Sequence, residues 1–260
     1  MKMKKSIIFS LLLAMGMSAS ALTIGERADS AYNKEDYRQA IELYKQSIEQ
    51  EGRSSDIYYN LGNAYYRNDN LGKAVVNYER ALRLNPTNAD ARTNLEFVNS
   101  RIQDRPEDDS AFLANLHHSL MSAMTPNAWA WTAFIIFLLF AGAVGLYIFS
   151  TNVAFRKTGF FGGIVLICVF AYTLMLASDS ADYAQNHDSA VVIVPNTQLS
   201  STPRAAKTAN DKVVTIHEGT KVEIVDSVAT PDDPVSSRWY NVKINNSTKA
   251  WLSASDVERI

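Results

Sequence analysis

Two long uncharged runs constrain the fold of this 260-residue chain more than any other feature of its sequence. Residues 129–149 and 159–177 contain no Asp, Glu, Lys, Arg or His. As helices rising 1.5 Å per residue they would be about 31 and 28 Å long, close to the thickness of a bilayer's hydrocarbon core. Neither run has the polar stripe of a helix packed against a soluble core. The sequence therefore predicts a two-helix transmembrane hairpin.

The charges beside these spans predict their orientation. The loop expected at residues 150–158 carries Arg156 and Lys157 and no acidic residue. Short basic loops of this kind stay on the cytoplasmic side of a membrane. Both the N-terminal and the C-terminal part of the mature chain are therefore expected on the opposite side.

Residues 1–21 have the pattern of a secretory signal peptide. Three lysines precede an apolar stretch at residues 7–17, and Ala19-Ser20-Ala21 supplies the small residues of a cleavage site before Leu22. This pattern agrees with the orientation of the spans. The expected location is a bacterial inner membrane with two spans, periplasmic N-terminal and C-terminal domains, and a short basic cytoplasmic loop.

Composition and motifs exclude several functional classes. The net charge is −2, with 25 basic against 27 acidic residues, and removal of the three leader lysines leaves 22 against 27, a net −5. Such a balance does not favour nucleic-acid binding. The single cysteine, Cys168, lies inside a span, and the four histidines show no metal-ligand spacing. No nucleophile elbow or phosphate loop is present. We expect no enzyme, no cofactor and no metal.

Residues 22–105 repeat with a period of 34, as the pairs Ala40/Ala74 and Tyr44/Tyr78 show. The second copy resembles the tetratricopeptide (TPR) family, because eight residues occur at the spacing of that repeat: Tyr58, Leu61, Gly62, Tyr65, Ala74, Tyr78, Ala81 and Pro86. Small residues at Gly62 and Ala74 would let two helices approach, and Tyr78 would fill the space beside them. The predicted array consists of repeats at 22–54 and 55–88 and a capping helix at 89–105.

The TPR resemblance implies a concave face that holds a peptide or a helix of a partner protein. By position, that face consists of Asp29, Tyr32, Asp56, Tyr59, Asn60, Asn63, Tyr66 and Arg67. We expect Asn63 and Arg67 to be exposed, so that replacing both weakens partner binding and leaves the fold intact. The alternative is that these residues only solvate a spacer.

After a linker at 178–189, residues 190–260 are rich in short β-strand patterns. Two turns, His217-Glu218-Gly219 and Asn245-Asn246-Ser247, predict hairpins. Five strands are expected, at 190–194, 212–216, 220–225, 239–244 and 249–252. The motif order resembles bacterial SH3-like domains, which implies a small all-β barrel that holds cell-wall peptide or a protein. The turn Ser200-Ser201-Thr202-Pro203 departs from the usual pattern of those domains.

Together the predicted parts make a multidomain membrane protein: leader, all-α TPR helical array, linker and juxtamembrane segment at 106–128, two-helix transmembrane hairpin and small all-β SH3-like barrel. This order resembles the Bacteroides aerotolerance operon E (BatE) family. The resemblance implies a non-catalytic inner-membrane scaffold, or adaptor, whose periplasmic TPR array binds partners within a Bat-type envelope stress complex. The implied partners are membrane proteins with von Willebrand A domains and, indirectly, a MoxR-type ATPase. The alternative is an envelope-binding module in which the barrel contacts peptidoglycan and the array is a spacer.

Overall fold

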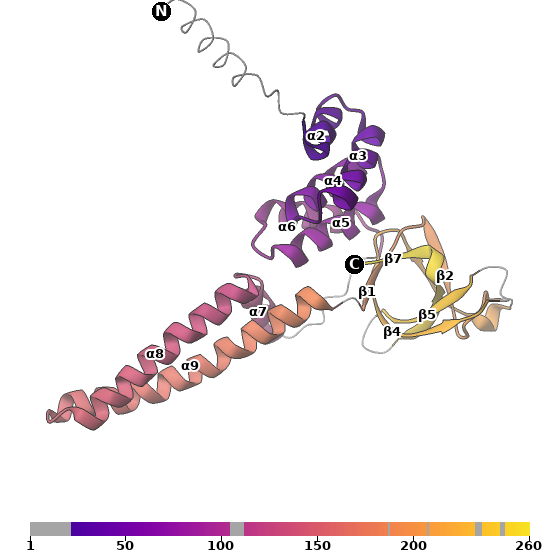
Figure 1. The fold of residues 1–260 in the computed structure, drawn as a ribbon. Coiled ribbons are helices and arrows are strands. Elements are labelled where there is room, and N and C mark those ends of the chain that lie inside the picture. The colour runs from indigo at the N-terminus through magenta and orange to yellow at the C-terminus, as the bar shows by residue number, and fades with distance from the viewer. Residues whose placement is uncertain (1–21, 105–111, 187, 207, 232–235, 245–247) are drawn as a thin grey trace, which may run out of the picture.

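The structure, a computed structural model, describes residues 22–104, 112–186, 188–206, 208–231, 236–244 and 248–260. It consists of a helical array, a pair of long helices and an antiparallel sheet (Figure 1). The predicted signal peptide and the linker residues 105–111 lie outside the described residues.

The array contains five helices: α2 (Ile24–Asn33), α3 (Tyr37–Gln50), α4 (Ser55–Arg67), α5 (Leu71–Leu84) and α6 (Ala89–Asn99). Each begins at a residue whose side chain accepts a backbone N–H of the first turn: Thr23, Asp36, Ser54, Asn70 and Asn88. The turns after α2 and α4 each contain a residue in the left-handed region, Glu35 at φ 63° and Asp69 at φ 59°. These two residues are one repeat period apart, so the backbone repeats as the sequence does.

The core of the array contains the small and aromatic residues that the repeat pattern singled out. Ala74 is fully buried, and Tyr78 is 1 % exposed. A Cβ atom at Gly62 would lie 2.7 Å from Tyr78 Cε1, closer than real Cβ contacts come. The predicted packing of the Tyr78 ring against Gly62 is therefore confirmed.

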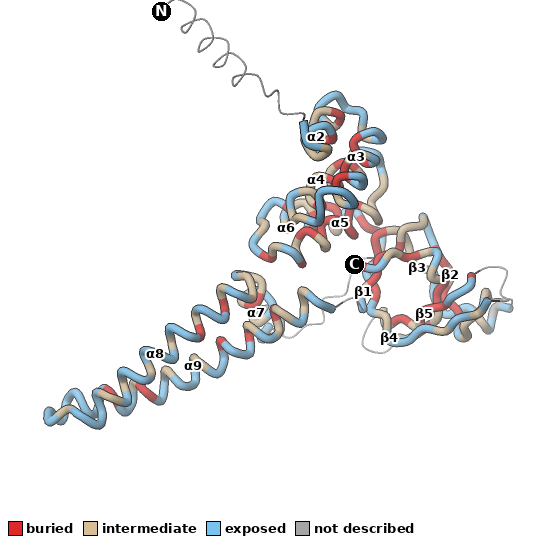
Figure 2. The backbone as a smooth tube through the Cα atoms, in the orientation of Figure 1, coloured by how far each residue is buried: buried red, intermediate tan, exposed pale blue. Residues whose placement is uncertain are grey.

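Two long apolar helices, α8 (Pro126–Phe149) and α9 (Val153–Gln185), project away from the array. Their most apolar windows both have a mean hydropathy of 2.4, and only 6 % and 17 % of those windows are buried. Most residues along both helices are therefore exposed (Figure 2), as apolar residues would be in lipid. Helix α9 begins before the uncharged run, so Arg156 and Lys157 lie in its first turns and the loop is shorter than predicted.

A shorter helix, α7 (Phe112–Met121), packs against the end of this hairpin that is nearest the array. Met121 is buried with Trp129 of α8 and Leu176 of α9. His117 Nε2 lies 2.9 Å from Asp179 Oδ2. These contacts fix α7 on α9.

The C-terminal sheet has seven antiparallel strands in the order β3-β2-β6-β5-β4-β1-β7. Their bounds are β1 (Ser189–Val192), β2 (Asn196–Ser200), β3 (Lys212–His217), β4 (Lys221–Ala229), β5 (Arg238–Lys243), β6 (Lys249–Ser253) and β7 (Val257–Arg259). The prediction of five strands was wrong, because β2 and β7 are short and carry few β-branched residues. Among the described strands, the edge strands β3 and β7 do not pair, so the sheet is not closed as a barrel.

One of the two predicted hairpins was wrong. Strand β3 pairs with β2, and β4 pairs with β1 and β5, so the turn at 217–219 joins two strands that diverge. The turn itself forms, with Gly219 at φ 90°. It binds the array instead, because the His217 backbone N–H donates to Asp104 Oδ2 at 2.6 Å. The other predicted hairpin joins β5 to β6, with Lys243 opposite Lys249, and its turn residues 245–247 lie outside the described residues.

The array and the sheet share one apolar core, a contact that the sequence pattern did not indicate. Val75, Val98 and Ile102 of the array are buried together with Val191 of β1 and Ile260. A Cβ at Gly72, the second residue of α5, would lie 2.5 Å from the carbonyl oxygen of Val192. Helix α5 can therefore approach β1 this closely only because it has no side chain at that position.

Candidate functional site

The first helices of the repeats and the capping helix line a groove on one face of the array. Its cavity of about 280 Å³ is lined by Tyr32 of α2, by Tyr59, Asn63, Tyr66 and Arg67 of α4, by Tyr78 of α5, and by Asn94, Phe97 and Val98 of α6. We call this cavity the concave groove. Each lining helix is positioned by the close helix pairs described above, so the groove is part of the packed array.

Five of the eight residues predicted for this face line the groove. Asn60 and Asp29 are not among the lining residues and bond to each other, because Asn60 Nδ2 donates to Asp29 Oδ1 at 3.2 Å. The same oxygen accepts a hydrogen bond from the hydroxyl of Tyr44 at 2.5 Å. Asp56 is an exposed residue in the first turn of α4 and does not line the groove.

Asn63 has a structural role that its sequence position did not indicate. Its Oδ1 accepts hydrogen bonds from the Tyr78 hydroxyl at 2.7 Å and from Asn94 Nδ2 at 2.9 Å. Burial raises the pKa of Tyr78, so this phenol stays protonated and donates at neutral pH. Removing Asn63 would leave a buried hydroxyl without its acceptor, at about 1–3 kcal/mol. Asn63 is half-buried, so the expectation of an exposed side chain was wrong, and we now expect its replacement to lower stability.

Aromatic rings and guanidinium groups dominate the rest of the groove. The Tyr66 and Phe97 rings meet edge to face with centroids 5.9 Å apart. Arg101 Cζ lies 4.4 Å from the Phe97 centroid, and its Nη1 donates to the Tyr66 hydroxyl at 2.7 Å. Arg67 Cζ lies 4.8 Å from the centroid of Tyr37. Rigid rings beside fixed positive charges suit an apolar side chain flanked by an acidic group.

The sequence interpretation missed the contribution of the capping helix and the residues just after it. Asn94, Phe97 and Arg101 lie one 34-residue period after Asn60, Asn63 and Arg67. Continuing the predicted face by one more period would have found all three. The 34-residue period of the sequence was therefore enough to indicate these three residues.

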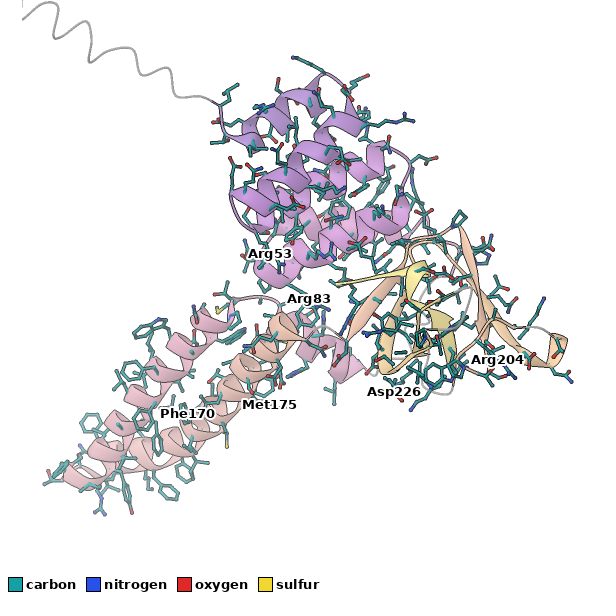
Figure 3. The ribbon with its side chains drawn as sticks, turned by 45° about the vertical axis from the view of Figure 1, so that its right-hand side comes forward. Arg53, Arg83, Phe170, Met175, Arg204 and Asp226 are labelled. Carbon is teal, nitrogen blue, oxygen red and sulfur yellow. The ribbon has the colours of Figure 1, made fainter. Side chains whose placement is uncertain are left out.

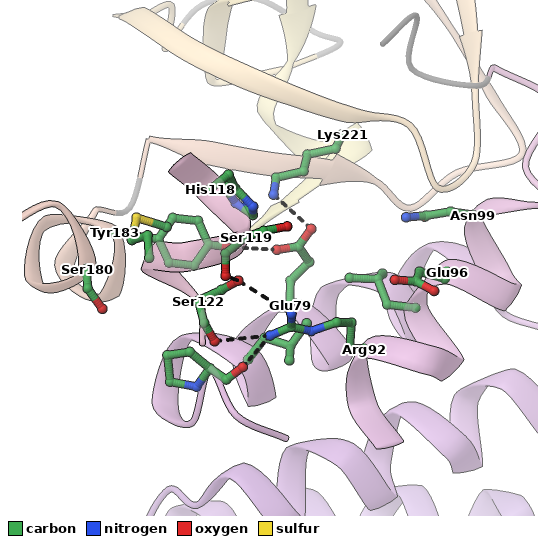
Figure 4. A pocket seen from close by; sticks show the side chains of 14 residues that line it. Glu79, Arg92, Glu96, Asn99, His118, Ser119, Ser122, Ser180, Tyr183 and Lys221 are labelled. Atoms are coloured by element: carbon green, nitrogen blue, oxygen red, sulfur yellow. Dashed lines mark hydrogen bonds and ion pairs between the residues drawn. The ribbon is translucent and has the colours of Figure 1, made fainter. Parts of the chain in front are cut away.

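A second cavity, of about 290 Å³, lies where α5, α6, α7, α9 and β4 meet (Figure 4). Glu79 of α5 is only 6 % exposed and accepts hydrogen bonds from Lys221 Nζ at 2.8 Å and from the Tyr183 hydroxyl at 3.2 Å. A buried carboxylate is tolerated when it has such partners. Glu79 thus joins the array to the sheet and to α9.

Other polar residues around this cavity also bond within the protein. Arg92 Nη2 donates to the Pro86 carbonyl oxygen, and Arg92 Nη1 donates to Ser122 Oγ at 3.4 Å. The His118 ring meets the Tyr183 ring edge to face at 6.1 Å, and burial lowers the pKa of His118. These contacts connect α6, α7 and α9 structurally.

Asp104 forms another contact between the array and the sheet. Its carboxylate accepts from the His217 backbone N–H, lies 3.0 Å from His217 Nδ1, and accepts from Thr220 Oγ1 at 2.9 Å. Burial opposes ionisation of this carboxyl, but these hydrogen bonds prevail and lower the pKa of Asp104. Asp104 is therefore held as an anion at neutral pH.

Metal chemistry has no candidate ligand set in the described residues. They contain no group of three or more His, Cys, Asp or Glu side chains that could hold a metal ion.

Two family models match the array, and both describe the same repeat. The model described as tetratricopeptide repeat matches residues 55–88, and the model described as TPR repeat matches residues 28–69. No curated protein matches the chain. The matches cover neither the apolar helices nor the sheet. Residues 28–88 are therefore tetratricopeptide repeats, which supports the resemblance drawn from the sequence.

Proposed function

We propose that this protein is a non-catalytic, membrane-anchored scaffold whose concave groove binds a segment of a partner protein. The observation that supports this most directly is the groove itself, which is lined by Tyr59, Tyr66, Arg67 and Phe97, with Arg101 packed against the Tyr66 and Phe97 rings. Tetratricopeptide repeats generally mediate binding of protein partners, and aromatic and arginine residues are enriched at the energetic centres of such interfaces.

The groove's chemistry defines the segment that would fit. An aromatic or aliphatic side chain would contact the rings, and an Asp or Glu beside it would approach the guanidinium groups. Asn63 could also bind the backbone of such a segment. Its side-chain oxygen already accepts two hydrogen bonds within the array, whereas its amide N–H groups can donate to a backbone carbonyl of the ligand.

The membrane hairpin sets where the scaffold acts. Helices α8 and α9 are antiparallel and joined by three residues, so the array and the sheet lie on the same side of any membrane that the hairpin spans. Arg156 and Lys157 lie at the opposite end, which favours a cytoplasmic position for that end and a periplasmic one for both domains. The proposed location is the bacterial inner membrane.

The specific partners follow from the order of parts and its likeness to the BatE family. They are membrane subunits with von Willebrand A domains, with a MoxR-type ATPase acting indirectly, in a Bat-type envelope stress complex. The SH3-like assignment of the sheet belongs to the same proposal, as does the absence of an enzymatic activity.

Replacing Arg67→Glu together with Phe97→Ala should weaken partner binding strongly and leave folding intact. Side-chain exposures of 47 % for Arg67 and 47 % for Phe97 limit the cost in stability to about 0.5 kcal/mol each. Loss of two hot-spot contacts should weaken binding by roughly tenfold or more. The measurement is affinity capture of the full-length protein from solubilised membranes of its own cells, with quantitative mass spectrometry of co-purified proteins.

The matched control is Arg38→Glu with Leu22→Ala, which makes similar changes at exposed residues outside the groove. It should capture the same partners as wild type. If the groove variant retains them equally well, the groove is not the binding surface. Sedimentation of the full-length protein with purified sacculi, unchanged by the groove variant, would then favour the peptidoglycan-binding alternative.

The orientation has its own test. In a Cys168→Ser background, a cysteine at Lys34→Cys should react with an impermeant thiol reagent in intact spheroplasts, because Lys34 is an exposed residue of the array. A cysteine at Thr151→Cys, between α8 and α9, should react only after the membrane is permeabilised. The reverse pattern would place the array and the sheet in the cytoplasm.

A further inference from the structure

Four arginines gather around a cavity separate from the concave groove. The cavity measures about 620 Å³, and Arg53, Arg80, Arg83 and Arg259 line it together with Tyr58 and the end of α9 at Ala184. Its size is within the range of small-molecule sites. No Asp or Glu side chain is among the residues that line it. We call it the arginine pocket; Figure 3 labels two of its residues, Arg53 and Arg83, on the side of the array near α9.

The charges around the pocket are only partly balanced within the protein. Arg80 Nη1 forms a close ion pair with Glu258 Oε1 at 2.6 Å. Arg259 Nη2 lies 3.9 Å from Asp188 Oδ1, and both side chains are largely exposed, at 47 % and 66 %. Arg53 is exposed and makes no ion pair with any other described residue. The pocket therefore keeps a positive charge that a ligand can meet.

Arg83 is the most buried of the four arginines. It is only 8 % exposed, and its Nη1 donates to the backbone carbonyl oxygens of Asn186 and Ile260. Its Nε is buried and has no hydrogen-bond partner in the structure. A buried guanidinium N–H without an acceptor is unfavourable.

Two of the four guanidinium groups, those of Arg53 and Arg83, make no ion pair with another described side chain, and this unbalanced charge indicates the ligand class. One carboxylate carries a single charge, whereas phosphate groups present several oxygens and up to two charges each. Guanidinium groups bind such oxygens in a bidentate manner. We propose that the arginine pocket binds a phosphate-bearing anion, with Arg53 at its open edge and Arg83 at its buried end.

The position of the pocket favours a lipid headgroup as the source of that phosphate. Ala184 lies seven residues beyond Ala177, where the uncharged run of α9 ends, which is about 10 Å along the helix. The headgroup layer of a bilayer begins at the end of the hydrocarbon core and extends for several ångströms. A phosphate of an acidic lipid in that leaflet would therefore lie within a few ångströms of Ala184 along the membrane normal, and a free phosphate anion shares the same chemistry.

The test uses the full-length protein and two probes. Inorganic pyrophosphate is titrated calorimetrically onto the protein in phosphatidylcholine nanodiscs, and phosphatidylglycerol retained from mixed micelles is counted by native mass spectrometry. Arg53→Glu should lower pyrophosphate affinity, lipid retention or both by about tenfold, as expected for loss of one charge-assisted contact. Arg38→Glu, an exposed arginine outside the pocket, should leave both unchanged.

Each outcome decides the proposal. Sensitivity of lipid retention to Arg53→Glu assigns the phosphate to a membrane lipid, and sensitivity of pyrophosphate binding alone assigns it to a soluble anion. Arg53→Gln serves as the variant if Arg53→Glu lowers the melting temperature. The proposal is overturned if wild type binds neither probe, or if Arg53 and Arg38 variants bind both probes equally.

Discussion

Tyr78→Ala is expected to unfold the second repeat and with it the concave groove. The ring is 1 % exposed, fills the space beside Gly62, and belongs to the apolar cluster that the array shares with the sheet. Truncating a buried aromatic residue costs about 3–5 kcal/mol. That is a large share of the stability of a small domain, which is typically 5–15 kcal/mol.

Tyr78→Phe is the matched control for this prediction. It keeps the ring and removes one hydrogen bond to Asn63, whose Oδ1 still accepts from Asn94. The expected cost is about 1 kcal/mol. Hydrogen exchange of the α4 and α5 amides reports the stability of this repeat by itself, so it is the proper readout. Equal exchange in the two variants would show that the ring does not stabilise the repeat.

The repeat region could be predicted because its contacts are local and periodic. Gly62 and Tyr78 are close in sequence, and the same pair of positions recurs in one family of repeats. Five residues of the groove followed from position alone. Phe97 and Arg101 did not, because Glu96 stands where the repeat has a small residue and the face was not continued into the capping helix.

The partners of polar side chains could not be predicted in the same way. Asn63 looked like an exposed groove residue, but its oxygen is the acceptor for a hydroxyl 15 residues away. A helical pattern shows which face a residue lies on and carries no information on hydrogen bonds made across that face.

The junction between the array and the sheet shows the largest gap between sequence and structure. Glu79 and Lys221 are separated by 142 residues, and Asp104 and His217 by 113. No local spacing connects such pairs. Contacts between distant residues also explain why the hairpin predicted at 217–219 was wrong. The residues of that turn bind Asp104 and Gly72 of the array.

The contact between α8 and α9 provides a direct comparison of two similar substitutions. A Cβ at Gly159 would lie 2.6 Å from the Ala143 carbonyl oxygen and 2.8 Å from the Tyr147 backbone nitrogen. These are backbone atoms of α8, so they cannot move unless the helix moves. At Gly162, by contrast, a Cβ would meet nothing within 4 Å.

Gly159→Leu should therefore separate α8 from α9, whereas Gly162→Leu should leave the hairpin intact. Both variants add the same apolar volume to the same helix, so their difference isolates the interhelical contact. Overpacking at a close contact costs about 1–3 kcal/mol or more. Trp129, buried against Leu176 of α9, provides the fluorescence signal for thermal melting in detergent. Gly159→Leu should melt several degrees below Gly162→Leu. Coincident melting curves would show that close packing at Gly159 does not hold the two helices together.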